Sequence, residues 1–140
     1  MGGEEPADEG SGADDAEYPS LPVDLAFEVL AKRRSRYLCY VLYERSGTIA
    51  IDRAAAYIAA IEAETAVDEV PGELAHRVHT DLSHATVPKL ADHDLLAHDA
   101  DTDAITLTAR GEGLVPYLSL AKTQEPDVVR RLPDRSGDGS

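Results

Sequence analysis

The sequence has little that would tie it to an oxidising compartment or to a membrane. It contains a single cysteine, Cys39, which excludes an internal disulfide bond. No apolar run approaches the roughly 20 residues that a membrane span needs. The N-terminus has neither a basic start nor an apolar run, so no signal peptide is expected. These absences predict a cytoplasmic protein without a membrane partner.

Lysine is also scarce, while acidic residues are abundant. Three lysines and ten arginines stand against 27 acidic residues, which gives a formal net charge of −14. Alanine is common and large apolar residues are few. This composition resembles that of proteins from extreme halophiles. At molar salt the Debye length is about 3 Å or less, so that self-repulsion costs little and hydrated carboxylates keep a protein in solution.

The composition divides the chain into three parts. Residues 1–20 hold seven acidic residues, no basic residue and no Val, Ile or Leu. Such a segment buries too little apolar surface to offset the entropy of ordering, so it is predicted to be a disordered acidic tail. Residues 125–140 are polar and contain Pro and Gly, which predicts a flexible tail. The predicted domain, 21–124, is long enough for one compact core.

Apolar spacing within this domain predicts mainly helices together with a small β-hairpin. The expected helices lie at 21–30, 31–47, 53–64, 73–92 and 112–123, and the expected strands at 48–51, 95–98 and 104–108. Asp52 is the predicted N-cap of the third helix. Leu74, Val78, Leu82 and Ala85 form the predicted buried side of the fourth. Pro88 is expected to distort that helix, and Pro116 to interrupt the last one.

This order of elements is that of a winged helix-turn-helix with a C-terminal helix. Two stretches carry a more specific likeness, "FEVLAKRRSRYLCYVLYERSGTIAI" and "RVHTDLSHATVPKLADHDLLAHDADTDAITLT". They resemble a haloarchaeal family of small winged-helix domains of unknown function over about residues 24–108. The resemblance implies a DNA-binding transcriptional regulator.

Within such a fold, 73–92 is the predicted recognition helix. Its outward side chains can bond bases or phosphates, and Lys89 lies near its end. The run "KRRSR" is a predicted phosphate clamp, with a solvated helix start that pairs with Glu28 and nearby acids as the alternative. The predicted site for double-stranded DNA therefore comprises His76, Arg77, Thr80, Ser83, His84, Lys89, Lys32, Arg33, Arg34 and Arg36.

The predicted wing is unusually acidic. Asp94 to Asp103 contains four aspartates and no Lys or Arg, although DNA binding normally depends on basic contacts that release counterions. Three interpretations remain open. The wing points away from DNA, it meets phosphate through bound cations, or the domain does not bind DNA.

Neither a metal site nor a catalytic site is predicted. His76, His79, His84, His93 and Cys39 lack the spacing of a complete ligand set. The turn "DADTD" begins like an EF-hand loop, but Ala104 and Arg110 occupy positions that need Gly and Glu. No phosphate loop or nucleophile elbow is present. Cys39 lies in an apolar stripe, as a core thiol would. We therefore expect no cofactor and no enzymatic activity.

The segment "LVPYLSL" after the predicted wing is either an exposed amphipathic stretch or a helix that covers the core, and its position suggests a homodimer. The predicted dimer residues are Leu114, Val115, Tyr117 and Leu118. A dimer would present two recognition helices to two half-sites. The alternative function is a dimeric protein–protein interaction module that uses the winged-helix fold without DNA contact.

Overall fold

The structure is a computed structural model that describes residues 18–45 and 48–132. Most of the predicted acidic tail (1–17) and residues 133–140 of the predicted C-terminal tail lie outside the described residues. The described chain is mainly helical, with one three-stranded antiparallel sheet. Among the described residues, no helix is long and apolar enough to cross a membrane.

Seven α-helices alternate with shorter elements along the described chain. The α-helices are α1 (Val23–Ala31), α2 (Arg33–Arg45), α3 (Ile51–Ala63), α4 (Gly72–Asp81), α5 (Val87–Asp92), α6 (Val115–Gln124) and α7 (Pro126–Arg131). The strands are β1 (Thr48–Ala50), β2 (Leu96–Asp99) and β3 (Ala104–Leu107). Two 3-10 turns, η4 (Val67–Glu69) and η6 (Gly111–Leu114), and one π-helical turn, η5 (Leu82–Thr86), complete the set.

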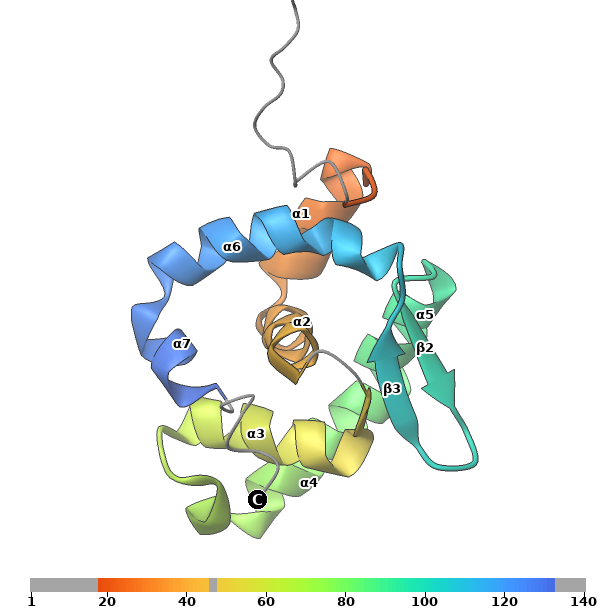
Figure 1. Cartoon of the computed structure of the whole chain (residues 1–140). Coiled ribbons are helices and arrows are strands. Elements are labelled where there is room, and N and C mark those ends of the chain that lie inside the picture. Colours follow the sequence, from red (N-terminus) through yellow and green to blue (C-terminus); the bar gives the residue numbers. More distant parts are fainter. Residues whose placement is uncertain (1–17, 46–47, 133–140) are drawn as a thin grey trace, which may run out of the picture.

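Helix α2 runs through the centre of the molecule. In Figure 1 it is seen end-on, with α1, α6, α7, α3, α4, α5 and the sheet arranged around it. Four consecutive side chains, Leu38, Cys39, Tyr40 and Val41, have no exposed surface. A helix that is buried on every side belongs inside a core rather than on its surface. The other elements therefore pack against this helix as a common centre.

The sheet has the order β1-β3-β2, so β1 pairs with the far strand of the hairpin. Ile49 lies opposite Ile105 in this pairing, and both side chains are buried. On the other side of the sheet the hydroxyl groups of Thr48 and Thr106 are hydrogen-bonded at 2.8 Å. The alternation places one face on the core and the other toward solvent. The expected strand at 48–51 is thus present and enlarges the hairpin to three strands.

The start of α3 differs from the prediction. The helix begins at Ile51, its N-cap is Ala50, and no side chain caps it. Asp52 therefore lies in the first turn and is not the N-cap. The amide of Ile51 donates instead to the carbonyl oxygen of Asp103 at 3.0 Å. The end of the hairpin turn thereby satisfies one of the first-turn amides that have no partner within the helix.

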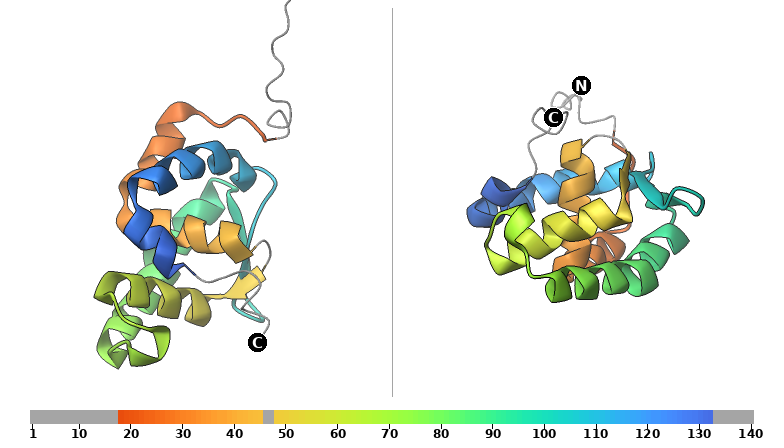
Figure 2. Two further views of the ribbon diagram at one scale, coloured as in Figure 1. Left: turned by 60° about the vertical axis from the view of Figure 1, so that its left-hand side comes forward. Right: turned by 90° about the horizontal axis from the view of Figure 1, so that it is seen from below.

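The predicted recognition helix is one rod made of three segments, α4, η5 and α5, which follow one another in the right-hand view of Figure 2. The π turn ends just before Pro88, which lies in the first turn of α5. A π turn holds an extra residue, so it accommodates the missing amide and the bulk of a proline. It also shifts the buried face. Ala85, predicted to be buried, is exposed, and Thr86 is buried instead.

The C-terminal part also departs from expectation. Pro116 lies in the first turn of α6 and does not interrupt it, because a proline there gives up no helical hydrogen bond. The chain continues past Gln124, the predicted end of the domain, into α7. Val128 and Leu132 pack against the core. The folded part therefore extends to Leu132.

Candidate nucleic-acid interface

The outer face of α4 and η5 carries the predicted base-reading side chains. His76, Arg77 and His84 are exposed, while Thr80 and Ser83 are half-buried. They lie opposite the buried side of this rod, where Val78 and Leu82 contact the core. The guanidinium of Arg77 lies 3.7 Å from the carboxylate of Glu73, one turn earlier, and 61% of the arginine side chain stays exposed. This exposed pair is weak enough to open for a ligand.

The basic run at the start of α2 divides into two kinds of residue. Lys32 and Arg33 are exposed. Arg34, in contrast, bonds both carboxylate oxygens of Glu62 at 2.7 and 2.9 Å and approaches Asp81 at 3.5 Å. The hydrogen bonds to Glu62 raise the pKa of the Arg34 guanidinium above its usual value. Arg34 therefore joins α2 to α3 and α4, and these internal ion pairs would have to open for its guanidinium to act in the predicted phosphate clamp.

Arg36 is held inside the protein in the same way. Its guanidinium donates to both oxygens of Glu125 at 2.8 and 2.9 Å and to the carbonyl of Leu30 at 2.6 Å. The hydroxyl of Tyr40 donates to the same carboxylate at 2.8 Å. Burial acts to raise the pKa of Glu125, but these hydrogen bonds outweigh it and lower the pKa below the usual carboxyl value. Arg36 thus fixes the start of α7 through hydrogen bonds within the protein.

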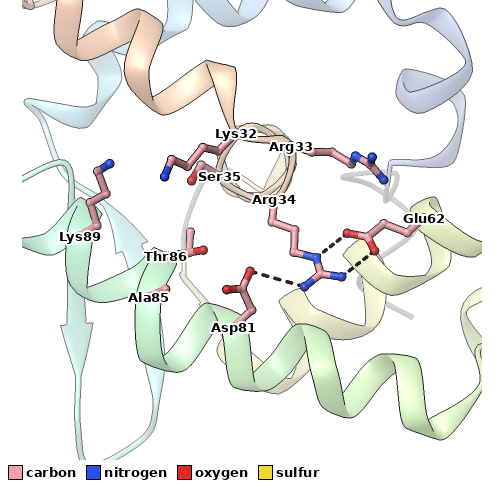
Figure 3. Close-up of a pocket in the computed structure, with 9 residues that line it drawn as sticks. All are labelled: Lys32, Arg33, Arg34, Ser35, Glu62, Asp81, Ala85, Thr86 and Lys89. Atoms are coloured by element: carbon pink, nitrogen blue, oxygen red, sulfur yellow. Dashed lines mark hydrogen bonds and ion pairs between the residues drawn. The ribbon is translucent and has the colours of Figure 1, made fainter.

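A pocket of about 450 Å³ opens beside the first turn of α2, between that turn and the rod α4–η5–α5. We call it the α2 pocket, and Figure 3 labels the residues that line it. Its basic lining residues are Lys32, Arg33, Arg34 and Lys89, and its acidic ones are Glu62 and Asp81. Lys89 also forms an ion pair with Glu28 of α1.

Two hydroxyl groups line this pocket, those of Ser35 and Thr86. Both face the space between α2 and the rod in Figure 3. Neither residue belongs to the site predicted from the sequence. For Ser35, the only indication in the sequence was its position within a basic run. Thr86 is buried because of the π turn, and the sequence pattern did not predict that turn.

The hairpin tip is acidic, as predicted. At the end of the turn, the carbonyl oxygen of Asp103 accepts a hydrogen bond from the amide of Ile51 in α3. Asp99 and Asp101 are exposed. Asp103 has a positive φ of 61°, and its carboxylate accepts a hydrogen bond from Nε2 of His98 at 2.8 Å. The tip therefore offers carboxylates to solvent, and no Lys or Arg lies between Asp94 and Asp103.

Among the described residues, one group could supply three metal ligands. Asp52, His79 and Asp103 come from α3, α4 and the hairpin turn, and their ligand atoms all lie within 4.8 Å of one another. His79 Nε2 is 2.9 Å from Asp52 Oδ1. Of the histidines and the cysteine considered for a metal from the sequence, His79 belongs to this group, and Asp103 comes from the turn "DADTD", for which calcium binding was rejected. Cys39 is fully buried, and burial raises the pKa of its thiol to about 12.

The predicted dimer residues lie mostly in the core of the chain itself. Leu114, Val115 and Leu118 are 0, 3 and 0% exposed, so they cannot form a surface for a second copy. The fourth, Tyr117, is partly buried and contacts the ring of Phe27 edge-on at 5.8 Å. The segment "LVPYLSL" does have an apolar face, but this face packs on the core of the chain and does not lie at the surface.

Taken together, the chain is a mainly helical domain with a three-stranded antiparallel sheet and an exposed polar helix face. It belongs to the family described as Domain of unknown function (DUF7344), whose model matches residues 27–106. This match covers nearly all of the region over which a family of unknown function was expected. No curated protein and no solved structure matches the chain.

Proposed function

We propose that this protein is a winged helix-turn-helix DNA-binding regulator in which the rod α4–η5–α5 is the recognition helix. The supporting observation is the arrangement itself. The hairpin of β2 and β3 follows the rod and pairs with β1, which precedes it in the chain. The rod keeps a polar face that includes Arg77 free of the core. Arginine, serine, threonine and histidine on such a face can bond base edges and phosphates in a major groove.

The phosphate contacts in this proposal come from fewer residues than the sequence suggested. Arg34 and Arg36 are engaged in internal ion pairs. Lys32, Arg33 and Arg77 remain exposed. With so few contacts, the salt dependence of binding should be shallow, because each neutralised phosphate contributes a slope of roughly −0.9 in log K against log salt. The acidic hairpin tip contributes no direct contact.

The test is fluorescence anisotropy of labelled double-stranded genomic fragments, titrated with protein from low to multimolar KCl. Arg77→Ala should weaken binding roughly 10- to 100-fold, the loss expected for one arginine that contacts a base. Arg130→Ala is the matched control. Arg130 is 69% exposed and also pairs with an acid on its own helix, Asp127, so the change in charge is the same. Equal effects of the two substitutions would contradict a specific role for the α4 face.

The salt series also separates the interpretations of the acidic hairpin. An affinity that holds or rises with KCl indicates that cations bridge the hairpin to phosphate. A steep negative slope excludes such bridging. Absence of binding at every KCl concentration, with the protein folded, rejects the DNA-binding proposal.

A second candidate function is a dimeric interaction module, and one surface favours it. Phe27 and Leu120 are 57 and 65% exposed and border a groove of about 350 Å³ between α1 and α6. An apolar patch is self-complementary, so a second copy can cover it, whereas the acidic surfaces of two copies repel one another. Sedimentation velocity tests this idea. Leu120→Ser should then abolish the dimer, while Val67→Ser, at another exposed apolar residue, should not. A wild-type monomer at all concentrations would reject it.

A further inference from the structure

We propose that the α2 pocket binds the phosphate group of a small molecule. The first observation is a pair of buried hydroxyls without partners. Ser35 and Thr86 are 4 and 7% exposed, and among the described residues neither side chain forms a hydrogen bond. Buried hydroxyls are almost always hydrogen-bonded, since leaving one unpaired costs free energy. Both groups point into the pocket (Figure 3), where a bound acceptor would satisfy them.

The second observation is the charge around these hydroxyls. Four basic side chains and two acidic ones line the pocket, although the chain as a whole carries −14. The two acids, Glu62 and Asp81, are both paired with Arg34, and Lys89 is paired with Glu28 of α1. Lys32 and Arg33 therefore supply the positive charge that these pairs leave over. The first turn of α2 contains no acidic residue, so the positive end of the helix dipole is not neutralised from within the helix. The ligand is therefore an anion.

The placement of the groups favours phosphate over other anions. The Ser35 hydroxyl comes from α2 and the Thr86 hydroxyl from η5, on opposite walls of the pocket. The ammonium groups of Lys32 and Lys89 extend into one side of it, as Figure 3 shows. A tetrahedral anion can accept hydrogen bonds from several directions at once, whereas a chloride or a planar carboxylate satisfies fewer of them. Phosphate oxygens also form strong charge-assisted hydrogen bonds.

The depth of the hydroxyls distinguishes a terminal phosphate from a DNA backbone. A phosphate monoester or inorganic phosphate can reach side chains that are 4 and 7% exposed. A backbone phosphodiester carries a sugar on both sides, which hinders it from entering as far. The proposal does not rest on DNA binding, and its test contains no DNA in the principal arm.

The experiment titrates the full chain with inorganic phosphate at constant ionic strength set by KCl, and records the melting temperature and the 31P signal of the ligand. Phosphate should raise the Tm by on the order of 10 °C at a concentration 100-fold above Kd, by linkage between binding and folding. Ser35→Ala and Thr86→Val should each weaken binding roughly tenfold, because each removes one charge-assisted hydrogen bond.

These two variants also separate binding from folding. Both remove hydroxyls that have no partner among the described residues, so without phosphate the double variant should melt no lower than the wild type. Ser119→Ala, at an exposed serine of α6, is the matched control and should bind phosphate normally. If the double variant fails to fold, Lys32→Gln provides the same test from an exposed residue, with Arg130→Gln as its control.

Three outcomes would overturn the proposal. The first is a wild-type Tm that responds to phosphate no more than to KCl of equal ionic strength. The second is a double variant, or Lys32→Gln, that binds phosphate as the wild type does. The third is a protein that binds a DNA duplex but not inorganic phosphate, and whose DNA binding requires Ser35 and Thr86. The pocket would then contact the DNA backbone. Failure of DNA binding alone leaves the expected phosphate response unchanged.

Discussion

At the scale of single residues, the basic run of α2 illustrates how one charge pattern serves different purposes. Arg34 and Arg36 are partly buried and bond acids that lie 28 and 89 positions away. Lys32 and Arg33, next to them in sequence, are exposed. The sequence predicted a basic surface correctly for the second pair only. Partners so distant leave no local pattern, so the engagement of the first pair required the tertiary structure.

The first prediction compares two arginines. Arg34→Ala should lower the free energy of unfolding by about 2 kcal/mol, because it leaves the carboxylate of Glu62, which is only 10% exposed, without its partner. Arg77→Ala removes only an exposed pair and should change stability by less than about 0.5 kcal/mol. Urea unfolding of both variants measures the difference. Similar losses would show that the Arg34 pair does not join the helices.

The second prediction concerns pH and Glu125. Its pKa is lowered in the folded protein, so its contribution to stability is complete above the usual carboxyl pKa of 4.5 and is lost as pH falls through the lower folded value. Glu125→Gln should therefore cost about 1 to 2 kcal/mol at pH 7, and progressively less below about pH 4.5. Urea unfolding of the wild type and of Glu125→Gln, from pH 7 to below pH 4.5, measures this difference in stability.

Glu69→Gln, at an exposed position in η4, is the control for that series. It should differ from the wild type by a small and nearly constant amount. A difference for Glu125→Gln that stayed constant down to pH 3 would show that the carboxylate is not stabilised by Arg36 and Tyr40.

At the scale of elements, the rod α4–η5–α5 shows where periodicity succeeds and where it fails. Leu74, Val78 and Leu82 follow helical spacing and face the core, as predicted. The prediction fails one turn later, at Ala85, because the π turn adds a residue and brings Thr86 inward. A sequence pattern with a fixed period cannot register such an insertion. The same turn creates one of the two unpartnered hydroxyls, so that part of the candidate site was also not predictable.

Helix α6 shows a second limit of sequence patterns. Its apolar stripe indicated a buried face, and Leu114 and Leu118 are buried. The pattern does not specify what covers that face. Here the covering surface is the chain's own core, since α6 packs on α2 (Figure 1). A dimer through these residues was therefore the wrong inference from a correct observation.

The third prediction concerns the ends of two elements and uses two glycines. A Cβ at Gly72, the first residue of α4, would meet no atom within 4 Å. Gly72→Ala should raise the free energy of unfolding by about 0.5 to 1 kcal/mol, because it restricts the unfolded chain. A Cβ at Gly111, at the start of η6, would lie 2.0 Å from the carbonyl oxygen of Leu95. Gly111→Ala should lower stability by about 2 kcal/mol or more.

Thermal and urea unfolding of the two alanine variants test this contrast. Opposite signs are expected from the same chemical change. A stabilised Gly111→Ala would mean that the hairpin and η6 are not packed together as described. A destabilised Gly72→Ala would argue against a helical start at this residue.

At the scale of the whole molecule, ion pairs between elements oppose a large excess of negative charge. Lys and Arg side chains join parts of the described chain that are distant in sequence, in the pairs Arg34–Glu62, Arg34–Asp81, Arg36–Glu125, Lys89–Glu28 and Lys122–Glu44. The 27 acidic residues outnumber the 13 basic ones by a factor of about two, so most carboxylates have no basic side chain to pair with. Screening by salt weakens both the attraction and the repulsion.

The last prediction is that repulsion between carboxylates affects the stability of the fold more than attraction within the ion pairs does. The Debye length falls from about 10 Å at 0.1 M salt to about 3 Å at 1 M, so repulsion between exposed carboxylates declines, whereas half-buried pairs at 3 Å are screened less. The Tm should therefore rise as KCl increases from 0.1 to 2 M. Replacing the exposed acids Asp68 and Glu69 with their amides should raise the Tm at low salt and reduce the gain from KCl. A Tm that falls with KCl would mean that the pairs between helices outweigh the repulsion, and the halophile-like composition would then have no bearing on stability.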